Sequence, residues 1–362
     1  MQFYEFKETQ ERVILIGVQT EVGDDVEASL DELEELAETA GAETVAKVIQ
    51  NREAVHPGTY IGKGKIEEVA SLLRALDANG VICDDELSPA QLNNLERELD
   101  CKVMDRTLLI LDIFAGRAVS SEGKIQVELA QLRYRAARLV GLRESLSRLG
   151  GGIGTRGPGE KKLETDRRLI RTRISALKAE LAQVEKHREL IRGKRSRGNL
   201  KTAAIVGYTN AGKSTLLNTL TGAGILAEDK LFATLYPTTR VLELKDGQQI
   251  LLTDTVGFIR KLPHHLVEAF KSTLEEAKYA DYIIHVVDAS NPQAELQMFT
   301  VYETLRELGA TGKKIVTLLN KQDQVTGSGI RDLKADYTVK CSARTGEGLD
   351  EFKDVLAKLL AE

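Results

Sequence analysis

The sequence predicts an α/β protein in three successive parts: an N-terminal α/β domain (residues 1–118), an antiparallel helical hairpin (119–197) and a C-terminal α/β domain with a mostly parallel sheet (198–362). Three observations predict this fold. Short apolar runs alternate with amphipathic segments at both ends of the chain, as in parallel α/β sheets. Two central segments repeat apolar residues every three or four positions, as paired helices do. A glycine-rich phosphate-binding motif opens the third part.

Composition limits the class of protein. Of the 362 residues, 42% are hydrophobic, which is enough for sizeable cores. The cysteines Cys83, Cys101 and Cys341 are widely spaced and match no metal-binding pattern, which is typical of a reducing compartment. The N-terminus lacks a signal-peptide pattern, and no apolar run approaches the ~18 residues of a membrane span. We therefore expect a cytoplasmic protein with no membrane span. We also expect a monomer.

The first part alternates strand-like and helix-like segments. We expect strands at 12–19, 44–50 and 80–84, where apolar residues run almost without interruption. Amphipathic helices are expected at 25–40, 65–78 and 89–99. Ser88 is a typical N-cap for the last of these helices, and Pro89 suits its first turn.

The central part carries two apolar stripes at helical spacing. Antiparallel helices that bury such stripes against each other form a hairpin. The stripes consist of Ile125, Leu129, Leu132, Ala136 and Leu139, and of Ile170, Ile174, Leu177, Leu181 and Val184.

A glycine-rich loop (residues 149–160, here the glycine arm) joins the two expected helices and reads Leu-Gly-Gly-Gly-Ile-Gly-Thr-Arg-Gly-Pro-Gly-Glu. From Ser120 to Leu200 there are 20 Lys and Arg against 9 Asp and Glu, although the whole chain has a net charge of −5. A flexible backbone beside many cations suits RNA phosphates. A mobile connector and a solvated helical face are the alternatives. The candidate RNA contacts are Gly151, Gly152, Arg156, Lys161, Lys162 and Arg167.

Residues 207–214 read Gly-Tyr-Thr-Asn-Ala-Gly-Lys-Ser and fit the P-loop pattern G-x-x-x-x-G-K-[ST]. The motif lies between an expected strand (202–206) and the start of an expected helix (214–218), as a P-loop requires. Lys213 is expected to reach the β- and γ-phosphates, and Ser214 to ligate Mg²⁺. The candidate nucleotide contacts here are Gly207, Tyr208, Thr209, Asn210, Ala211, Gly212, Lys213, Ser214 and Thr215.

The motif Asn320-Lys321-Gln322-Asp323 follows an apolar run at 315–319 and predicts the base. The Asp323 carboxylate can accept hydrogen bonds from N1–H and the 2-amino group of guanine, which adenine does not offer. Ser342-Ala343, after an expected strand at 337–341, would bring a backbone N–H to the guanine O6, and the adjacent Arg344 is a further candidate contact. These motifs predict GTP and GDP as the ligands.

Two switch segments are expected between these motifs. Asp254-Thr255-Val256-Gly257 (the second switch segment) would hold Mg²⁺ through Asp254 and water, and would bring the Gly257 N–H to the γ-phosphate. Residues 232–239 (the first switch segment) supply the other ligand, for which we choose Thr238 with Thr239 as the alternative. Phe232, Thr234 and Thr255 are further candidate nucleotide contacts, and the candidate metal ligands are Ser214, Thr238 and Asp254.

No catalytic residue is assigned. Phe258 follows Gly257 where many GTPases carry a water-orienting Gln, so intrinsic hydrolysis should be slow. Asn210 resembles the P-loop Asn of GTPases that hold K⁺ beside the phosphates. The alternative is that Asn210 only tolerates a tight turn.

Together, the glycine arm, the P-loop, the segment Phe-Ala-Thr-Leu-Tyr-Pro-Thr-Thr-Arg and Asp-Thr-Val-Gly-Phe resemble the HflX family of translation GTPases over essentially the whole chain. The resemblance implies a protein that binds the large ribosomal subunit, places the glycine arm in ribosomal RNA near the peptidyl transferase centre, and splits stalled or idle ribosomes under stress. It also implies that the ribosome raises the hydrolysis rate. Some members carry a further domain after the position that matches Glu362, so contacts of such a domain are not carried over. A ribosome assembly GTPase and a signalling GTPase with a protein partner are the alternatives.

Overall fold

The computed structural model describes residues 10–20, 25–149, 158–196, 200–222, 231–232, 237–245, 247–261, 271–325 and 329–361. Contacts between residues divide the chain into two compact units, one comprising residues 1–116 and 127–178 and the other 117–126 and 179–362. The fold class is mixed α/β with parallel-dominated sheets, as the sequence predicts. The three-domain division remains a prediction.

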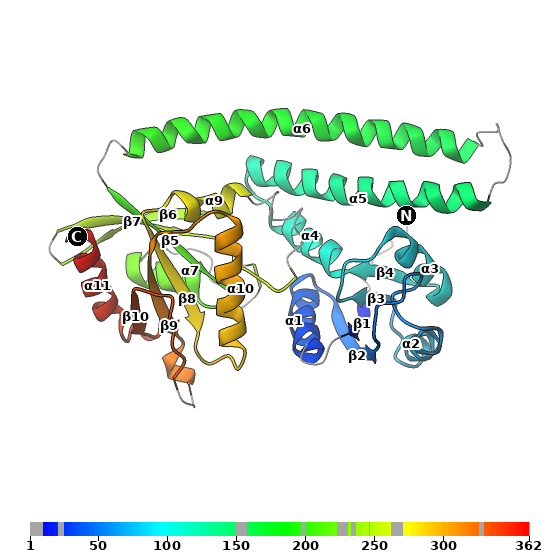
Figure 1. Cartoon of the computed structure of the whole chain (residues 1–362), viewed down its shortest axis with the longest axis horizontal. Helices are drawn as coiled ribbons and strands as arrows, with labels where there is room; N and C mark the ends of the chain where they lie inside the picture. The colour runs from blue at the N-terminus through cyan, green and yellow to red at the C-terminus, as the bar shows by residue number, and fades with distance from the viewer. Residues whose placement is uncertain are drawn as a thin grey trace, which may run out of the picture. The chain divides into compact units, whose positions relative to one another are not determined.

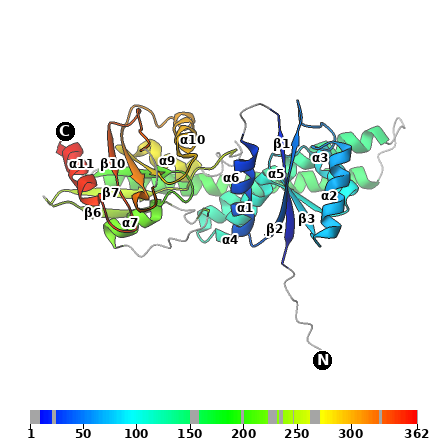
Figure 2. The same cartoon turned by 90° about the horizontal axis from the view of Figure 1, so that it is seen from below.

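The first unit contains a four-stranded parallel sheet in the order β2-β1-β3-β4. Helix α1 covers one face of this sheet, and α2 and α3 cover the other (Figure 2). The central strands are buried on both faces, which explains why they read as continuous apolar runs. The strands are β1 (Arg12–Gln19), β2 (Glu43–Asn51), β3 (Gly80–Cys83) and β4 (Lys102–Asp105).

The helices of this sheet domain begin at recognisable caps. The Ser88 side chain accepts a hydrogen bond from the Gln91 N–H, and the Gln91 side chain accepts one from the Ser88 N–H, with Pro89 in the first turn. This capping box confirms the predicted start of α3. The helices are α1 (Val26–Thr39), α2 (Lys63–Ala75), α3 (Pro89–Leu99) and α4 (Arg106–Arg117).

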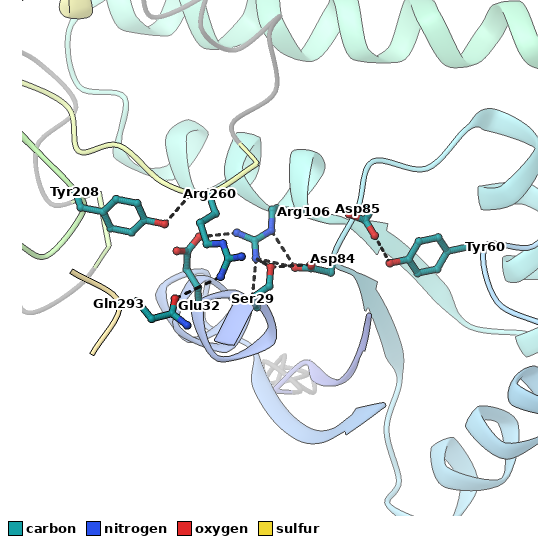
Figure 3. A network of polar contacts seen from close by, with 9 residues as sticks. All are labelled: Ser29, Glu32, Tyr60, Asp84, Asp85, Arg106, Tyr208, Arg260 and Gln293. Carbon is teal, nitrogen blue, oxygen red and sulfur yellow. Dashed lines mark hydrogen bonds and ion pairs between the residues drawn. The ribbon is translucent and has the colours of Figure 1, made fainter. Parts of the chain in front are cut away.

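A buried polar cluster fixes the start of α4 (Figure 3). The Arg106 side chain is 1% exposed and donates to Asp84 Oδ1 at 2.7 and 3.1 Å and to Glu32 Oε1 at 2.7 Å. Its Nη2 also donates to the Ser29 carbonyl oxygen at 2.7 Å. A buried guanidinium with matched anionic partners orients its helix strongly, because any displacement leaves a charge unpaired in the interior.

Two long antiparallel helices form the predicted hairpin (Figure 1): α5 (Ser121–Leu149) and α6 (Pro158–Ser196). Arg173 on α6 pairs with Glu128 on α5 at 2.7 Å. Nearer the other end, Arg167 Nη2 donates to the Leu139 carbonyl oxygen at 3.2 Å. Leu129 and Leu177 of the predicted stripes are buried, which confirms the seam between the helices.

The second unit contains a six-stranded sheet in the order β10-β9-β8-β5-β7-β6; β6 is antiparallel to β7, and the other described strand pairs are parallel. Helices α7 and α11 pack on one face with the main core, and α10 packs on the other face. The strands are β5 (Lys201–Gly207), β6 (Thr238–Glu243), β7 (Gln249–Asp254), β8 (Tyr282–Asp288), β9 (Lys314–Asn320) and β10 (Tyr337–Lys340). The helices are α7 (Lys213–Thr221), α9 (Lys271–Tyr279), α10 (Ala294–Glu307), the 3-10 turn η1 (Gln322–Gln324) and α11 (Leu349–Ala361).

Candidate nucleotide site

The P-loop connects β5 to α7 at the carboxyl edge of the second sheet, where open α/β sheets bind ligands. Gly212 ends the loop at a φ of +95°, and a Cβ at this position would collide with the Asn320 amide. Only glycine meets both conditions. Asn210 also has a positive φ, +59°, which fits the tight-turn role that Asn tolerates.

Lys213 is buried beneath the P-loop backbone. Its Nζ donates to the carbonyl oxygens of Gly207 at 3.2 Å and Tyr208 at 2.6 Å. Burial lowers the pKa of Lys213 from 10.5 to about 8, and the nearby Asp254 carboxylate only partly opposes this effect. The ammonium is therefore held in place but costly to keep charged until an anion arrives.

This pKa predicts a pH dependence of nucleotide affinity. Phosphate binds the protonated lysine, so the affinity for GDP at pH 9 should be about tenfold lower than at pH 7, with a proton taken up on binding. Calorimetric titrations in two buffers of different ionisation enthalpy measure both quantities. Lys213→Arg, which stays charged, should bind more weakly but with a flatter profile. A flat profile in the parent protein would contradict the pKa.

The lowered pKa of Lys213 also makes the free energy of unfolding depend on pH. The unfolded lysine keeps its proton up to about pH 10.5, whereas the folded, nucleotide-free lysine loses it near pH 8. The unfolded state therefore binds more protons between these values. Lys213 then makes a contribution to the free energy of unfolding that rises with pH across this window.

Three predicted metal ligands come from three elements that meet beside Lys213. Ser214 Oγ donates to Asp254 Oδ2 at 2.8 Å, and Asp254 is fully buried. Thr238 lies directly opposite Asp254 in the β6–β7 ladder, so the two side chains project from the same face. The Thr239 hydroxyl instead lies 3.0 Å from that of Thr253. This geometry favours Thr238 over Thr239, and hydroxyl and carboxylate oxygens are the ligands that fit Mg²⁺.

The residues directly after the second switch segment are joined to the P-loop by hydrogen bonds of their backbone. The Phe258 N–H donates to the Gly207 carbonyl at 3.1 Å, and the Thr209 N–H donates to the Phe258 carbonyl at 2.8 Å. The Arg260 N–H donates to the Tyr208 hydroxyl at 2.7 Å, and Arg260 Nη1 to Gln293 Oε1 at 3.4 Å (Figure 3). Phe258 is 1% exposed, so its ring is packed inside the protein and orients no water.

The predicted base-binding residues line one cavity of about 370 Å³. Asp323 lies in η1 and is exposed toward solvent, as a residue that must receive a base requires. Residues of the P-loop and residues of the two base-binding motifs both line the cavity, which supports a single ligand that contacts both sets. The lining residues are Asn210, Gly212, Thr215, Asn320, Lys321, Asp323, Gln324, Ser342, Ala343 and Arg344.

Within this cavity Asn320 joins two loops. Its Nδ2 donates to the Ala211 carbonyl at 2.8 Å, and its Oδ1 accepts the Ala343 N–H at 2.8 Å. The Ser342 N–H donates to the Glu347 carbonyl at 3.0 Å. Both amides expected near guanine O6 therefore donate within the protein here, and the O6 contact remains a prediction. In this structure Asn320 therefore links the P-loop, at Ala211, to the loop after β10, at Ala343.

Asp288 joins the site without having been identified in the sequence. Lys321 Nζ lies 2.7 Å from Asp288 Oδ2, and the Ser290 N–H and hydroxyl both donate to Asp288 Oδ1. Lys321 also has a φ of +60°. The half-buried ion pair holds the Lys321 side chain at the cavity that it lines. An acidic residue ending the apolar run 282–288 was the available signal in the sequence.

Several predicted contacts fall outside the description. Thr234, Gly151, Gly152 and Arg156 lie outside the described residues. Lys161 and Lys162 lie within α6, and their side chains are outside the described part. Arg167 is half-buried and donates to α5, so part of its guanidinium supports the hairpin. Phe232 is described and is buried.

Comparisons with known proteins agree with this geometry. Three families match successive parts of the chain: "GTP-binding GTPase N-terminal" (residues 27–115), "GTP-binding GTPase Middle Region" (117–195) and "50S ribosome-binding GTPase" (202–321). The "GTPase HflX" of Lacrimispora saccharolytica is 69% identical over 357 residues, covering 98% of this chain and 84% of that protein. The chain belongs to the HflX family. The Escherichia coli "GTPase HflX" is 44% identical over 355 residues, covering 97% and 83%.

Solved structures extend the likeness to the fold. The crystal structure of SsGBP with GDP has a TM-score of 0.53 at 28% identity and covers 97% of this chain and 99% of that one. A GTP-binding protein from Sulfolobus solfataricus in complex with GDP has a TM-score of 0.50 at 26% identity, covering 97% and 99%. As an HflX-family protein with an assembled P-loop, the chain binds guanine nucleotides and hydrolyses GTP to GDP and phosphate. Among the described residues, no helix has both the length and the apolar character needed to cross a membrane.

Proposed function

We propose that this GTPase is Mg²⁺-dependent, binds the large ribosomal subunit and uses its GTP-bound state to split or remodel stalled or idle ribosomes. The observation that carries the proposal is the long hairpin of α5 and α6, which bears a concentrated positive charge in an otherwise acidic chain. A concentration of positive charge suits an RNA surface. The family description "50S ribosome-binding GTPase" for residues 202–321 supports the same partner.

The nucleotide site supplies the switch in this proposal. Ser214, Thr238 and Asp254 would hold Mg²⁺, which neutralises charge on the β- and γ-phosphates when it is bound. Lys213 would bind the same phosphates, and the Gly257 N–H the γ-phosphate. Asp323 would read guanine. The first and second switch segments would then order on GTP and relax after hydrolysis.

Hydrolysis needs help in this scheme, because Phe258 is buried and cannot orient water. The ribosome is the proposed activator, and its RNA near the peptidyl transferase centre is the proposed site of the glycine arm. K⁺ held by Asn210 is a second proposed source of positive charge. Hydrolysis rates that are equal in K⁺ and Na⁺ would remove it. The proposed setting is cytoplasmic and the proposed state a monomer.

A ribosome assembly factor is the second candidate. It would share the GTPase site but bind subunit precursors, so sedimentation with mature subunits separates the two functions. The third candidate is a signalling GTPase with a protein partner, and the positive charge of the hairpin disfavours it. Binding to RNA through the hairpin should weaken steeply with salt, so binding that is insensitive to salt would favour the protein partner.

The test is GTP turnover in K⁺ buffer with and without purified large ribosomal subunits. We expect more than about tenfold stimulation, since transition-state charge supplied in trans commonly raises slow GTPases by more than this. A flat, slow rate would leave the GTPase intact and remove the ribosome as its activator.

Removing cations in and just after the glycine arm should weaken large-subunit binding without disturbing the nucleotide site. The triple variant Arg156→Ala, Lys161→Ala, Lys162→Ala should bind large subunits about tenfold more weakly, with a shallower salt dependence. A matched control removes three exposed cations elsewhere: Arg97→Ala, Arg306→Ala, Lys358→Ala. GDP affinity should be unchanged in both. Equal subunit affinity of the two triple variants would contradict the RNA role.

A further inference from the structure

Thr209, the third residue of the P-loop, carries a buried hydroxyl that has no hydrogen-bond partner among the described residues. The residue is 6% exposed, and its Oγ1 atom is inaccessible to solvent. Buried hydroxyl groups in folded proteins are nearly always hydrogen-bonded, because leaving one unpaired costs free energy. The unpaired hydroxyl of Thr209 therefore needs an explanation.

Neighbouring threonine hydroxyls contribute to the fold instead. The Thr255 hydroxyl, which is also buried, donates to the Ile205 carbonyl oxygen at 2.7 Å. On α7, the Thr219 hydroxyl donates to the Ala343 carbonyl oxygen at 2.7 Å. The Thr209 hydroxyl makes no such bond in the part of the chain that the structure describes. The P-loop pattern leaves its third position open to any residue type, so the pattern does not explain a threonine here.

The position of Thr209 supplies an explanation. A Cβ added to Gly257 would lie 2.7 Å from Thr209 Cγ2 and 2.9 Å from Lys213 Nζ. Gly257 and Lys213 are proposed contacts of the γ-phosphate, so an anion bound by both lies beside the Thr209 side chain. The Thr209 N–H also donates to the Phe258 carbonyl oxygen at 2.8 Å, which holds this part of the P-loop against the residue after Gly257.

We propose that the Thr209 hydroxyl donates a hydrogen bond to the γ-phosphate and thereby raises the affinity for GTP relative to GDP. The inference rests on the proposed role of Gly257 in the switch. A hydrogen bond to a charged oxygen is stronger than one between neutral groups, and an unpaired donor gives up no other partner to form it. GDP has no γ-phosphate and leaves the hydroxyl as it is in the nucleotide-free protein.

The unpaired hydroxyl also makes a prediction for stability. Valine has nearly the shape of threonine but carries a methyl group in place of the hydroxyl, so Thr209→Val removes an unpaired buried polar atom. The melting temperature of the nucleotide-free variant should therefore equal or exceed that of the parent. A hydroxyl kept for stability would give the opposite result. Higher stability with weaker function is typical of a group that serves a ligand.

The test compares Thr209→Val and Thr209→Ser with the parent, using equilibrium binding of GDP and of a non-hydrolysable GTP analogue, both with Mg²⁺. Thr209→Val should bind the GTP analogue about tenfold more weakly, the effect of losing one hydrogen bond to a charged group, and GDP within about twofold of the parent. Thr209→Ser keeps the hydroxyl and should recover most of the affinity for the GTP analogue.

Thr44→Val is the matched control. Thr44 lies on β2 in the first unit, and its Oγ1 is likewise buried without a hydrogen-bond partner among the described residues. The control therefore removes the same kind of hydroxyl from the other sheet, and it should change neither affinity.

Three results would overturn the inference: unchanged binding of the GTP analogue by Thr209→Val, a loss in Thr209→Ser as large as in Thr209→Val, or an equal loss for both nucleotides. The last, with a lower melting temperature, would mark the hydroxyl as structural.

Gly257→Ala, assayed in parallel for GTP turnover, tests the basis of the inference separately. If Gly257→Ala turns over GTP slowly and Thr209→Val binds like the parent, the role of Thr209 fails alone. If Gly257→Ala hydrolyses GTP at the parent rate while Thr209→Val loses affinity for the GTP analogue only, the Thr209 contact stands and the role of Gly257 fails. None of these measurements involves the ribosome, so the proposed ribosomal partner is tested independently of them.

Discussion

Asp323→Asn is expected to transfer the nucleotide preference from guanine to xanthine. The carboxylate of Asp323 can accept from both N1–H and the 2-amino group of guanine. An asparagine amide has one acceptor and one donor, so its NH₂ group would face a donor of guanine. We expect the affinity for GDP and GTP to fall roughly 10²- to 10³-fold, the scale on which a mismatched polar site rejects a ligand. Equilibrium binding of fluorescent GDP measures the loss.

The gain of a new ligand makes this prediction specific. Xanthine carries an oxygen at C2 in place of the amino group, so the Asn NH₂ can donate to it while the amide oxygen accepts from N1–H. Xanthosine diphosphate should therefore bind Asp323→Asn more tightly than GDP does. Asp350→Asn, which changes an exposed acid on α11, is the matched control and should keep the preference of the parent. Loss of GDP binding with no gain for xanthosine diphosphate would remove Asp323 from the base contact.

The sequence predicts Asp323 as a base-binding residue, but it does not predict Asp288, which holds the neighbouring Lys321. The motif places Asp323 directly after β9, and the edge of a parallel sheet brings it near the P-loop. The Lys321–Asp288 ion pair, 2.7 Å between the two charged groups, joins residues that are 33 positions apart in the sequence. Asp288 ends β8, and Lys321 directly follows β9. The local signal at Asp288, an acid that ends an apolar run, is too common to single this residue out. Its partner becomes visible only through the pairing of β8 with β9.

The elements predicted best were those with local chemical signals. The capping box at Ser88, the glycine turn of the P-loop and the helical stripes of the hairpin each determine backbone geometry within a few residues. Arg106 carries no such signal. Its partners lie 22 to 77 residues away in sequence, and an arginine beside an apolar run looks the same whether it is buried or solvated.

Strand register favours one of two neighbours between which the sequence left a choice. Thr238 and Thr239 are chemically identical, and no local feature of the sequence separates them. In the β6–β7 ladder Thr238 lies opposite Asp254, whereas the Thr239 hydroxyl contacts that of Thr253. Successive residues of a strand face opposite sides, so only one of the two can project from the same face as Asp254. The choice depends on pairing over long range, which a single sequence does not display.

Gly257→Ala is expected to lower GTP turnover roughly a hundredfold, the cost of misplacing one donor to the transition state. A Cβ on Gly257 would lie 2.7 Å from Thr209 Cγ2, 2.8 Å from Thr209 Cα and 2.9 Å from Lys213 Nζ. The Thr209 Cα is backbone and cannot turn aside, so the second switch segment has to move away from the P-loop. The Gly257 N–H then leaves its proposed position at the γ-phosphate. Single-turnover hydrolysis with saturating GTP measures the effect on the chemical step.

Affinity for GDP should stay within about threefold of the parent, because the proposed Gly257 contact exists only with the γ-phosphate. Gly64→Ala is the matched control, since a Cβ there meets no atom within 4 Å and alanine is compatible with the first turn of α2, where Gly64 lies. If Gly257→Ala hydrolyses GTP at the parent rate, the close approach to Thr209 has no part in catalysis. If GDP affinity falls as far as turnover, the added methyl group has disturbed the P-loop itself, because the atoms it meets belong to Thr209 and Lys213 of that loop.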